Sequence, residues 1–125
     1  MTEKYPTLDQ VLAEKVMKWR LYSYDEDYYA KTAEHYEDAA SNDGWTWQGD
    51  ESGEEAWQWK PTEKMDHALA LAEKIGQSQG WQLIYTPWFK DTPYSMTCFI
   101  GAAHEAATPE MAICLEAKAW LVTQQ

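Results

Sequence analysis

The chain has 125 residues, and on size alone we expect a single domain over residues 1–125 with a core of its own. The 21 acidic residues exceed the 10 basic ones and give a formal net charge of −11, a field that repels DNA and RNA and argues against direct nucleic-acid binding. No apolar run approaches the ~20 residues of a membrane span, and the first residues lack the pattern of a signal peptide, so we expect a cytoplasmic protein that does not enter a membrane.

The first predicted element is a helix over residues 7–22. Thr7 is a good N-cap residue, and Gln10 three positions later completes a capping box. The apolar residues recur at the helical spacing i, i+3, i+4 and therefore share one face: Leu8, Val11, Leu12, Val16 and Trp19.

Three cations lie toward the end of this helix. Lys15, Lys18 and Arg20 place positive charge where the helix dipole favours it. Arg20 is the only arginine in the chain, and a guanidinium binds a phosphate or carboxylate through two parallel N–H groups. A surface arginine without such a task is the alternative.

An acidic insert of about residues 23–56 follows. Residues 25–59 hold eleven acidic residues and one basic residue, a net charge of −10, whereas the rest of the chain is nearly neutral. Such a surface attracts a basic protein, and the plain alternative is that it only confers solubility. A short helix is predicted over residues 30–40, followed by a turn at residues 42–44.

Four of the eight tryptophans lie between residues 45 and 59. Trp45 and Trp47 are two residues apart, as are Trp57 and Trp59, so in extended strands each pair lies on one face. The spacing predicts an antiparallel hairpin in which the two pairs meet as aromatic cross-strand pairs. This face either caps a small core or stacks on a planar ligand or a partner, and the sequence leaves both open.

Two more helices and a second hairpin are predicted in the remaining residues. Thr62 caps a helix that ends near residue 75, and alternating segments over residues 80–88 and 94–100 form a β-hairpin around a short turn. The last helix begins at Pro109 and is apolar on most sides, so more than one neighbour must bury it. This order of elements predicts an α+β fold.

No residue pattern indicates catalysis. The glycine-rich nucleotide motifs, the nucleophile elbow and the zinc-protease motif are missing, and no histidine has the ligand spacing of a metal site. His67 is expected in solvent and the pair His104–Glu105 in a loop, while Cys98 and Cys114 have apolar neighbours and are predicted to be buried free thiols. We therefore expect a non-enzymatic protein with no metal and no cofactor.

Three segments of the chain carry a resemblance to a known family. They are residues 12–19 (Leu-Ala-Glu-Lys-Val-Met-Lys-Trp), residues 61–68 (Pro-Thr-Glu-Lys-Met-Asp-His-Ala) and residues 107–115, whose Thr-Pro-Glu-Met-Ala-Ile-Cys is similar to a family ending Thr-Pro-x-x-Ala-Ile-Cys-x-Ala. In their order and spacing they resemble the phage ABA-sandwich domain proteins, small proteins of phages and prophages. The resemblance covers about half the residues. It implies a three-layer α-β-α sandwich, in which three main helices pack around a small antiparallel sheet of two hairpins.

The resemblance also implies a phage product that acts in the cytoplasm of an infected bacterium, and it carries no catalytic residues. The first hypothesis is an inhibitor of bacterial defence that sequesters a small nucleotide-type signal, because aromatic rings stack on bases. The acidic net charge works against an anionic ligand. The residues assigned to this site are four stacking tryptophans and three cations that would meet phosphate: Trp45, Trp47, Trp57, Trp59, Arg20, Lys15 and Lys18.

Two other hypotheses stay open. The chain is alternatively an acidic protein–protein inhibitor that imitates the charge of nucleic acid and occupies the basic groove of a host defence protein. A structural or assembly protein of the phage is the third possibility. The apolar last helix and the tryptophan excess favour a homo-oligomer under all three hypotheses. The residues assigned to the protein–protein surface are the acids and tyrosines of the insert: Tyr24, Asp25, Glu26, Asp27, Tyr28 and Tyr29.

Overall fold

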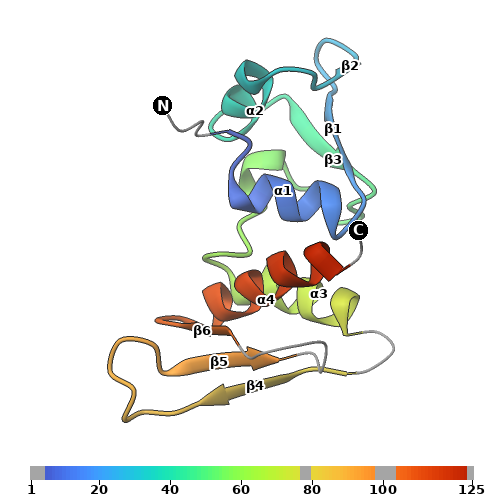
Figure 1. The fold of residues 1–125 in the computed structure, drawn as a ribbon. Coiled ribbons are helices and arrows are strands. Elements are labelled where there is room, and N and C mark those ends of the chain that lie inside the picture. The colour runs from blue at the N-terminus through green and yellow to red at the C-terminus, as the bar shows by residue number, and fades with distance from the viewer. Residues whose placement is uncertain (1–4, 77–79, 98–103, 124–125) are drawn as a thin grey trace. The chain divides into compact units, whose positions relative to one another are not determined.

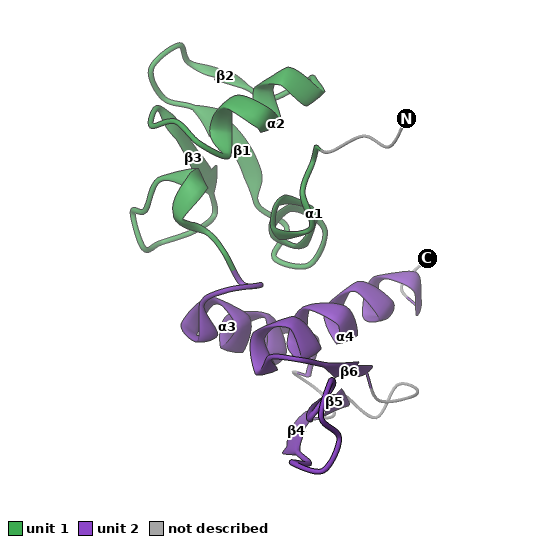
Figure 2. Ribbon diagram, turned by 90° about the vertical axis from the view of Figure 1, so that its left-hand side faces the viewer, with its two compact units in different colours: residues 1–60 green, residues 61–125 purple. Residues whose placement is uncertain are grey.

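The computed structural model describes residues 5–76, 80–97 and 104–123 (Figure 1). Within these residues it contains four α-helices and two three-stranded antiparallel sheets, which confirms the predicted α+β class. The chain divides into two compact units, residues 1–60 and residues 61–125 (Figure 2). The expectation of a single domain stays a prediction, because compactness alone does not establish that a unit folds independently.

The first unit is a small sheet with two short helices. The sheet has the order β2-β1-β3, and all its strands are antiparallel. Its elements in chain order are α1 (Leu8–Lys15), β1 (Arg20–Ser23), β2 (Tyr28–Tyr29), α2 (Ala33–Ala39), β3 (Trp45–Gln48) and the 3-10 turn η1 (Ala56–Gln58).

The first helix begins as predicted but ends earlier. Thr7 and Gln10 form the expected capping box, and each side chain accepts a hydrogen bond from the other residue's backbone N–H. The prediction that the helix continues to residue 22 is wrong, because Lys18 adopts a left-handed backbone conformation with φ of 64°. The chain leaves the helical conformation there and enters β1 at Arg20. The helical spacing of the apolar residues therefore continues beyond the end of the helix.

The predicted tryptophan hairpin is also wrong. β3 pairs with β1, with Trp47 opposite Leu21, and not with the segment around Trp57. That segment is η1, where Gln58 accepts a hydrogen bond from the backbone N–H of Glu55 at 2.7 Å and closes a tight local turn. One isolated bridge between Thr46 and Glu55 is the extent of the pairing between the two tryptophan segments.

The second unit is a sheet covered by two helices. The sheet has the order β4-β5-β6, α4 packs against β5 and β6, and α3 packs against α4 (Figure 1). No helix among the described residues is both long and apolar enough to cross a bilayer. The elements of this unit are α3 (Met65–Ile75), β4 (Gln82–Tyr85), β5 (Tyr94–Thr97), β6 (His104–Ala106) and α4 (Pro109–Thr123).

The predictions for the second unit hold in outline. The β4–β5 hairpin and the last helix are confirmed, and α4 is buried between α3 and the sheet, so the fold supplies the several neighbours that its apolar sides require. The pair His104–Glu105 is not in a loop but in β6, a third strand that the sequence did not indicate. Helix α3 starts three residues after Thr62, with Lys64 as its N-cap.

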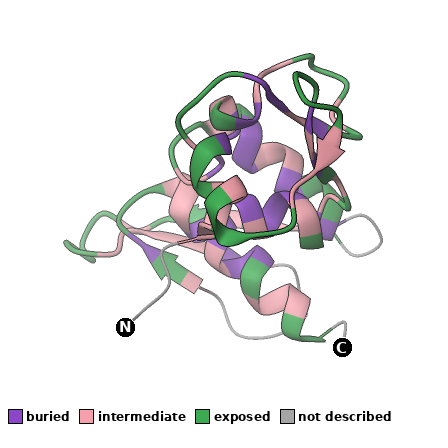
Figure 3. Ribbon diagram, turned by 90° about the horizontal axis from the view of Figure 1, so that it is seen from above, coloured by how far each residue is buried: buried purple, intermediate pink, exposed green. Residues whose placement is uncertain are grey.

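Each unit has its own core, with exposed loops around it (Figure 3). His67 lies in the second core with only 8% of its surface exposed, so the prediction of a solvent-exposed histidine is wrong. His67 precedes Ala68 on the buried side of α3. The buried side of the helix is therefore one position wider than the predicted apolar face. Cys114 is a buried free thiol as predicted, whereas Cys98 lies outside the described residues.

Candidate functional site

The turn between β1 and β2 presents a run of exposed polar side chains. Tyr24, Asp25, Glu26 and Asp27 are all exposed. The turn is held by Ser23, which is buried: its carbonyl accepts a hydrogen bond from the N–H of Asp27 at 2.8 Å, and its hydroxyl accepts one from the N–H of Glu26 at 3.3 Å. Asp27 has a φ of 61°, a conformation that aspartate tolerates better than most residues. The acids are therefore displayed on an ordered turn.

The carboxylate of Glu55 joins this turn to the loop before β3. The hydroxyl of Tyr24 donates to one oxygen of Glu55 at 2.5 Å, and the N–H of Gly44 donates to the other at 3.2 Å. Gly44 has a φ of 104°, and a Cβ atom built there would lie 2.6 Å from a carboxylate oxygen of Asp25. The positive φ favours glycine at this point, and a side chain there would also displace the carboxylate of Asp25.

Asp43 extends the same arrangement to an exposed tryptophan. The indole N–H of Trp57 donates to its carboxylate at 2.6 Å, and Trp57 is 36% exposed. Asp43 precedes Gly44, so the bonds run from Tyr24 through Glu55 and the backbone of residues 43–44 to Trp57. We call these five residues, which alternate rings and carboxylates, the acidic aromatic surface: Tyr24, Asp25, Asp43, Glu55 and Trp57.

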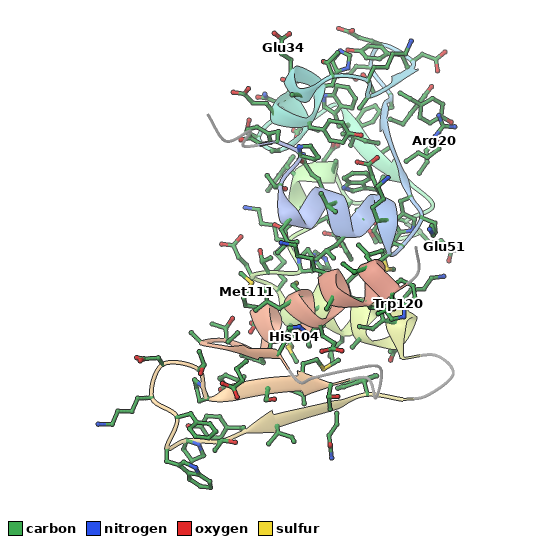
Figure 4. The ribbon with its side chains drawn as sticks, in the orientation of Figure 1. Arg20, Glu34, Glu51, His104, Met111 and Trp120 are labelled. Atoms are coloured by element: carbon green, nitrogen blue, oxygen red, sulfur yellow. The ribbon has the colours of Figure 1, made fainter. Side chains whose placement is uncertain are left out.

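The surrounding charge is negative and exposed. None of the eleven acidic residues between 25 and 59 is buried, and Lys31 is the single basic residue among them. Glu34 and Glu51 extend away from the ribbon of the first unit (Figure 4). Within the described part of the chain, no cation forms an ion pair with any of the following acids: Asp25, Glu26, Asp27, Glu34, Glu37, Asp43 and Glu51.

Two tyrosines of this region hold their protons more firmly than free tyrosine. The hydrogen bond to Glu55, with a smaller effect of desolvation, raises the pKa of Tyr24. Desolvation, with the nearby charge of Glu26, raises the pKa of Tyr28. Both phenols therefore stay neutral donors at physiological pH, and the negative charge of the surface comes from its carboxylates.

Three of the four tryptophans assigned to stacking lie in the core. Trp45, Trp47 and Trp59 are 3%, 2% and 6% exposed, and only Trp57 reaches solvent. Trp59 packs edge-on against Trp19 with ring centroids 4.8 Å apart, and its indole N–H donates to the carbonyl of Asp9 at 2.9 Å. The arrangement corresponds to the core-capping alternative rather than to a stacking platform.

The three predicted phosphate-binding cations are all exposed. Arg20 lies with its guanidinium 3.7 Å from the ring centre of Tyr29, whose hydroxyl donates to Gln48 at 2.5 Å (Figure 4). Lys15 and Lys18 are exposed, and no side-chain interaction involves either of them within the described residues. The guanidinium of Arg20 thus has a ring as its partner in the structure.

Tyr28 belongs more to the core edge than to the exposed surface. It is half-buried, and its ring contacts His35 and Trp45 with centroid distances of 5.1 and 5.7 Å. The indole N–H of Trp45 donates to Asp38 at 2.7 Å. Of the six residues assigned to a protein–protein surface, Tyr24 and the three acids at positions 25–27 are exposed, whereas Tyr28 and Tyr29 are half-buried.

The described residues contain no group of three or more histidine, cysteine, aspartate or glutamate side chains that could hold a metal ion. The second unit has one polar pair beneath its sheet, in which the ring Nδ1 of His104 lies 2.6 Å from the carboxylate of Glu116, itself 1% exposed (Figure 4). This pair joins β6 to α4. Its position between the sheet and the helix gives it a structural role.

Comparison with known proteins adds no assignment. No model of a known protein family matches the chain, and neither the curated proteins nor the solved structures include a match. The resemblance to the phage ABA-sandwich proteins therefore stays a prediction.

Sequence reasoning missed Asp43, Glu55 and the pairing of Trp57 with an acid. The hydrogen bonds that these residues make span 11 to 31 positions, and no periodicity relates their partners. The sequence signal at this site is Gly44, which the predicted turn at residues 42–44 explains only in part. A glycine before a strand also marks a close approach of another segment, here the turn that carries Asp25.

Proposed function

We propose that this protein is a non-enzymatic binding protein whose acidic aromatic surface binds a basic surface of another protein. The observation that carries the proposal is the fixed, cation-free alternation of rings and carboxylates at Tyr24, Glu55, Asp43 and Trp57. Carboxylates attract lysine and arginine, and tyrosine and tryptophan rings add cation–π contacts with the same side chains.

The charge of the insert extends this attraction beyond contact distance. A net charge of −10 over residues 25–59 steers a basic partner toward the surface and repels nucleic acid from it. A protein with this charge competes with DNA or RNA for the same basic groove. Together with the resemblance to phage proteins, this makes a nucleic-acid-binding complex of bacterial defence the expected target and inhibition the expected outcome.

The alternative of nucleotide sequestration has less support. Its stacking platform would need Trp45, Trp47 and Trp59, which are buried, and its phosphate contacts would need cations beside them. Trp57 is the one ring of the four that is available, and its indole N–H is bonded to an acid. Calorimetry against cyclic and ADP-ribose-derived nucleotides checks this alternative, and we expect no heat of binding.

The test of the proposed function is native mass spectrometry of the protein purified from bacteria with an active defence system. We expect a complex with a basic, nucleic-acid-binding protein of that system, and we expect added DNA or RNA to compete with the chain for it. Recovery of the chain with a nucleotide and without any protein partner would contradict the proposal.

A further inference from the structure

The outer edge of β4 is an unpaired strand edge. β4 is the terminal strand of its sheet, and among the described residues no strand pairs with its far side. Thr86 donates its N–H to the carbonyl of Pro93 across the hairpin at 2.6 Å. Because backbone groups alternate in direction along an antiparallel strand, the N–H and C=O groups of Leu83 and Tyr85 point to the open side.

This short edge strand lacks the charged residues and the bulge that natural sheets use to prevent pairing. Residues 80–89 contain no charged residue, in a chain of which 25% of the residues are charged. The pairing of β4 with β5 is continuous from Gln82 to Tyr85, without a bulge, and Pro87 lies beyond the strand. An uncharged, regular edge is a template for another strand.

Apolar side chains at this edge are exposed. Ile84 is 44% exposed, Tyr85 59%, and Trp88 at the end of the hairpin 76%. Among the described aromatic rings, Trp88 contacts its neighbour Phe89, with centroids 6.4 Å apart, and Phe89 is itself 49% exposed. Large apolar groups gathered in this way mark an interaction surface.

We propose that β4 pairs antiparallel with β4 of a second copy of the chain, about a twofold axis at Ile84. In this register Ile84 lies opposite Ile84 of the partner subunit, and Leu83 lies opposite Tyr85 of the partner subunit. Leu83 and Tyr85 are the residues whose backbone groups point outward, so each Leu83–Tyr85 pair exchanges two hydrogen bonds. The two sheets become one continuous six-stranded sheet.

The register is self-complementary at the side-chain level. The two Ile84 residues form a non-hydrogen-bonded pair, the kind in which opposite side chains approach most closely. Leu83 and Tyr85 face the same side of the sheet, so the pairs that they form across the axis are apolar on that side. The same axis brings the Trp88 end of each hairpin to the Gly80–Trp81 end of the other strand.

Charge explains why a second copy meets this edge and not another surface. Two copies with a net charge of −11 each repel one another, most strongly through the acidic residues 25–59. The uncharged stretch 80–89 lets two such chains associate without placing like charges in contact. The inference does not depend on the proposed function, because it uses none of the residues of the acidic aromatic surface.

Cysteine cross-linking tests the register. Ile84→Cys places two thiols opposite one another across the axis, at a Cα separation of about 4.5 Å that suits a disulfide. We expect mild oxidation to convert most of this variant to a disulfide-linked dimer on a non-reducing gel. Ser95→Cys is the matched control, since Ser95 lies opposite Ile84 on the inner strand and faces the same side. The native cysteines are present in both variants and set the background.

Light scattering tests the association itself. We expect the wild-type chain to show twice its 14.5 kDa mass at micromolar concentration, and Ile84→Lys to weaken dimerisation at least tenfold while circular dichroism shows an unchanged fold. Ser95→Lys adds the same charge one strand inward and should leave the dimer intact. A wild-type mass of 14.5 kDa at all concentrations, or cross-linking of Ile84→Cys no greater than that of Ser95→Cys, overturns the proposal. A complex of the edge with a different protein in place of the homodimer also overturns it.

Discussion

Trp47 and Trp59 occupy similar core positions but differ in one hydrogen bond. Trp59 donates its indole N–H to the carbonyl of Asp9, whereas the indole N–H of Trp47 is buried and has no partner among the described residues. A buried polar group without a partner costs about 1–3 kcal/mol, and a hydrogen bond that is made contributes about 0.5–1.5 kcal/mol to stability. The difference between the two indole N–H groups is therefore expected to appear in the free energy of unfolding.

Matched substitutions to phenylalanine separate the two cases. Both remove the same ring volume, but Trp59→Phe also removes a hydrogen bond to the Asp9 carbonyl, whereas Trp47→Phe removes an indole N–H that has no partner among the described residues. We expect Trp59→Phe to lower the free energy of unfolding by about 1–3 kcal/mol more than Trp47→Phe. Urea unfolding followed by circular dichroism provides both values, and equal losses would contradict this account of the core.

Tyr36 gives the stability of the first unit an alkaline dependence. Desolvation, followed by the hydrogen bond to Glu14 at 2.9 Å, raises the pKa of Tyr36 to about 12 from an ordinary value of 10.0. The folded state holds this proton longer than the unfolded state, so the stabilising contribution is complete below pH 10 and is lost as the pH rises from 10 toward 12.

Tyr36→Phe removes this contribution and serves as its control. We expect the wild-type protein to lose more stability than the variant as the pH rises through that window, because only the wild type has the group to titrate. Urea midpoints measured in parallel at several pH values report the difference. Parallel curves for the two proteins would show that the Tyr36–Glu14 bond does not carry the effect.

At the scale of elements, the end of α1 depends on the left-handed conformation of Lys18. The left-handed conformation costs a residue with a Cβ atom about 1 kcal/mol of folding free energy, and it has no such cost for glycine. We expect Lys18→Gly to raise the free energy of unfolding by up to about 1 kcal/mol. Lys15→Gly changes the same residue type inside the helix and should lower it by about 0.5–1 kcal/mol. A loss of stability in both variants would mean that the helix does not end as described.

Elements with strong local signals were predictable from the sequence. The Thr7–Gln10 capping box, the Thr108–Pro109 helix start and the β4–β5 hairpin all rest on residues that act within one or two turns of chain. The end of α1 had no such signal, because the apolar spacing continued to Trp19 and a lysine gave no warning of a left-handed residue. β3 pairs with a strand over 20 residues earlier, and spacing within one segment cannot reveal that partner.

The candidate site was predictable in composition but not in geometry. The excess of acids and rings between residues 23 and 59 is visible in the sequence, whereas the turn at residues 25–27 and the two strands that it joins are not. Burial of Trp45 and Trp47 depends on which face of β3 meets the core, and a two-residue spacing suits either outcome. The bonds of Glu55 and Asp43 join separate loops and depend on the tertiary fold.

The whole molecule carries two candidate binding surfaces that differ in charge. The acidic surface of the first unit is proposed to meet a basic partner, and the uncharged edge of β4 a second copy of the chain. Salt distinguishes them, because attraction between charged surfaces weakens at high ionic strength while edge pairing does not. We expect 0.5 M salt to dissociate the partner complex and to leave the homodimer in place, as gel filtration will report.

The proposed function assigns partner binding to the charge of the acidic aromatic surface and of the exposed acids beside it in the β1–β2 turn. It is tested most directly by comparing two triple variants that remove the same charge in capture from bacteria with an active defence system. Asp25→Asn, Glu26→Gln and Asp27→Asn neutralise the turn, and Asp66→Asn, Glu73→Gln and Asp91→Asn neutralise three exposed acids of the second unit. The account predicts that the first variant loses the partner and the second retains it. Capture that is equal for both variants would contradict the account.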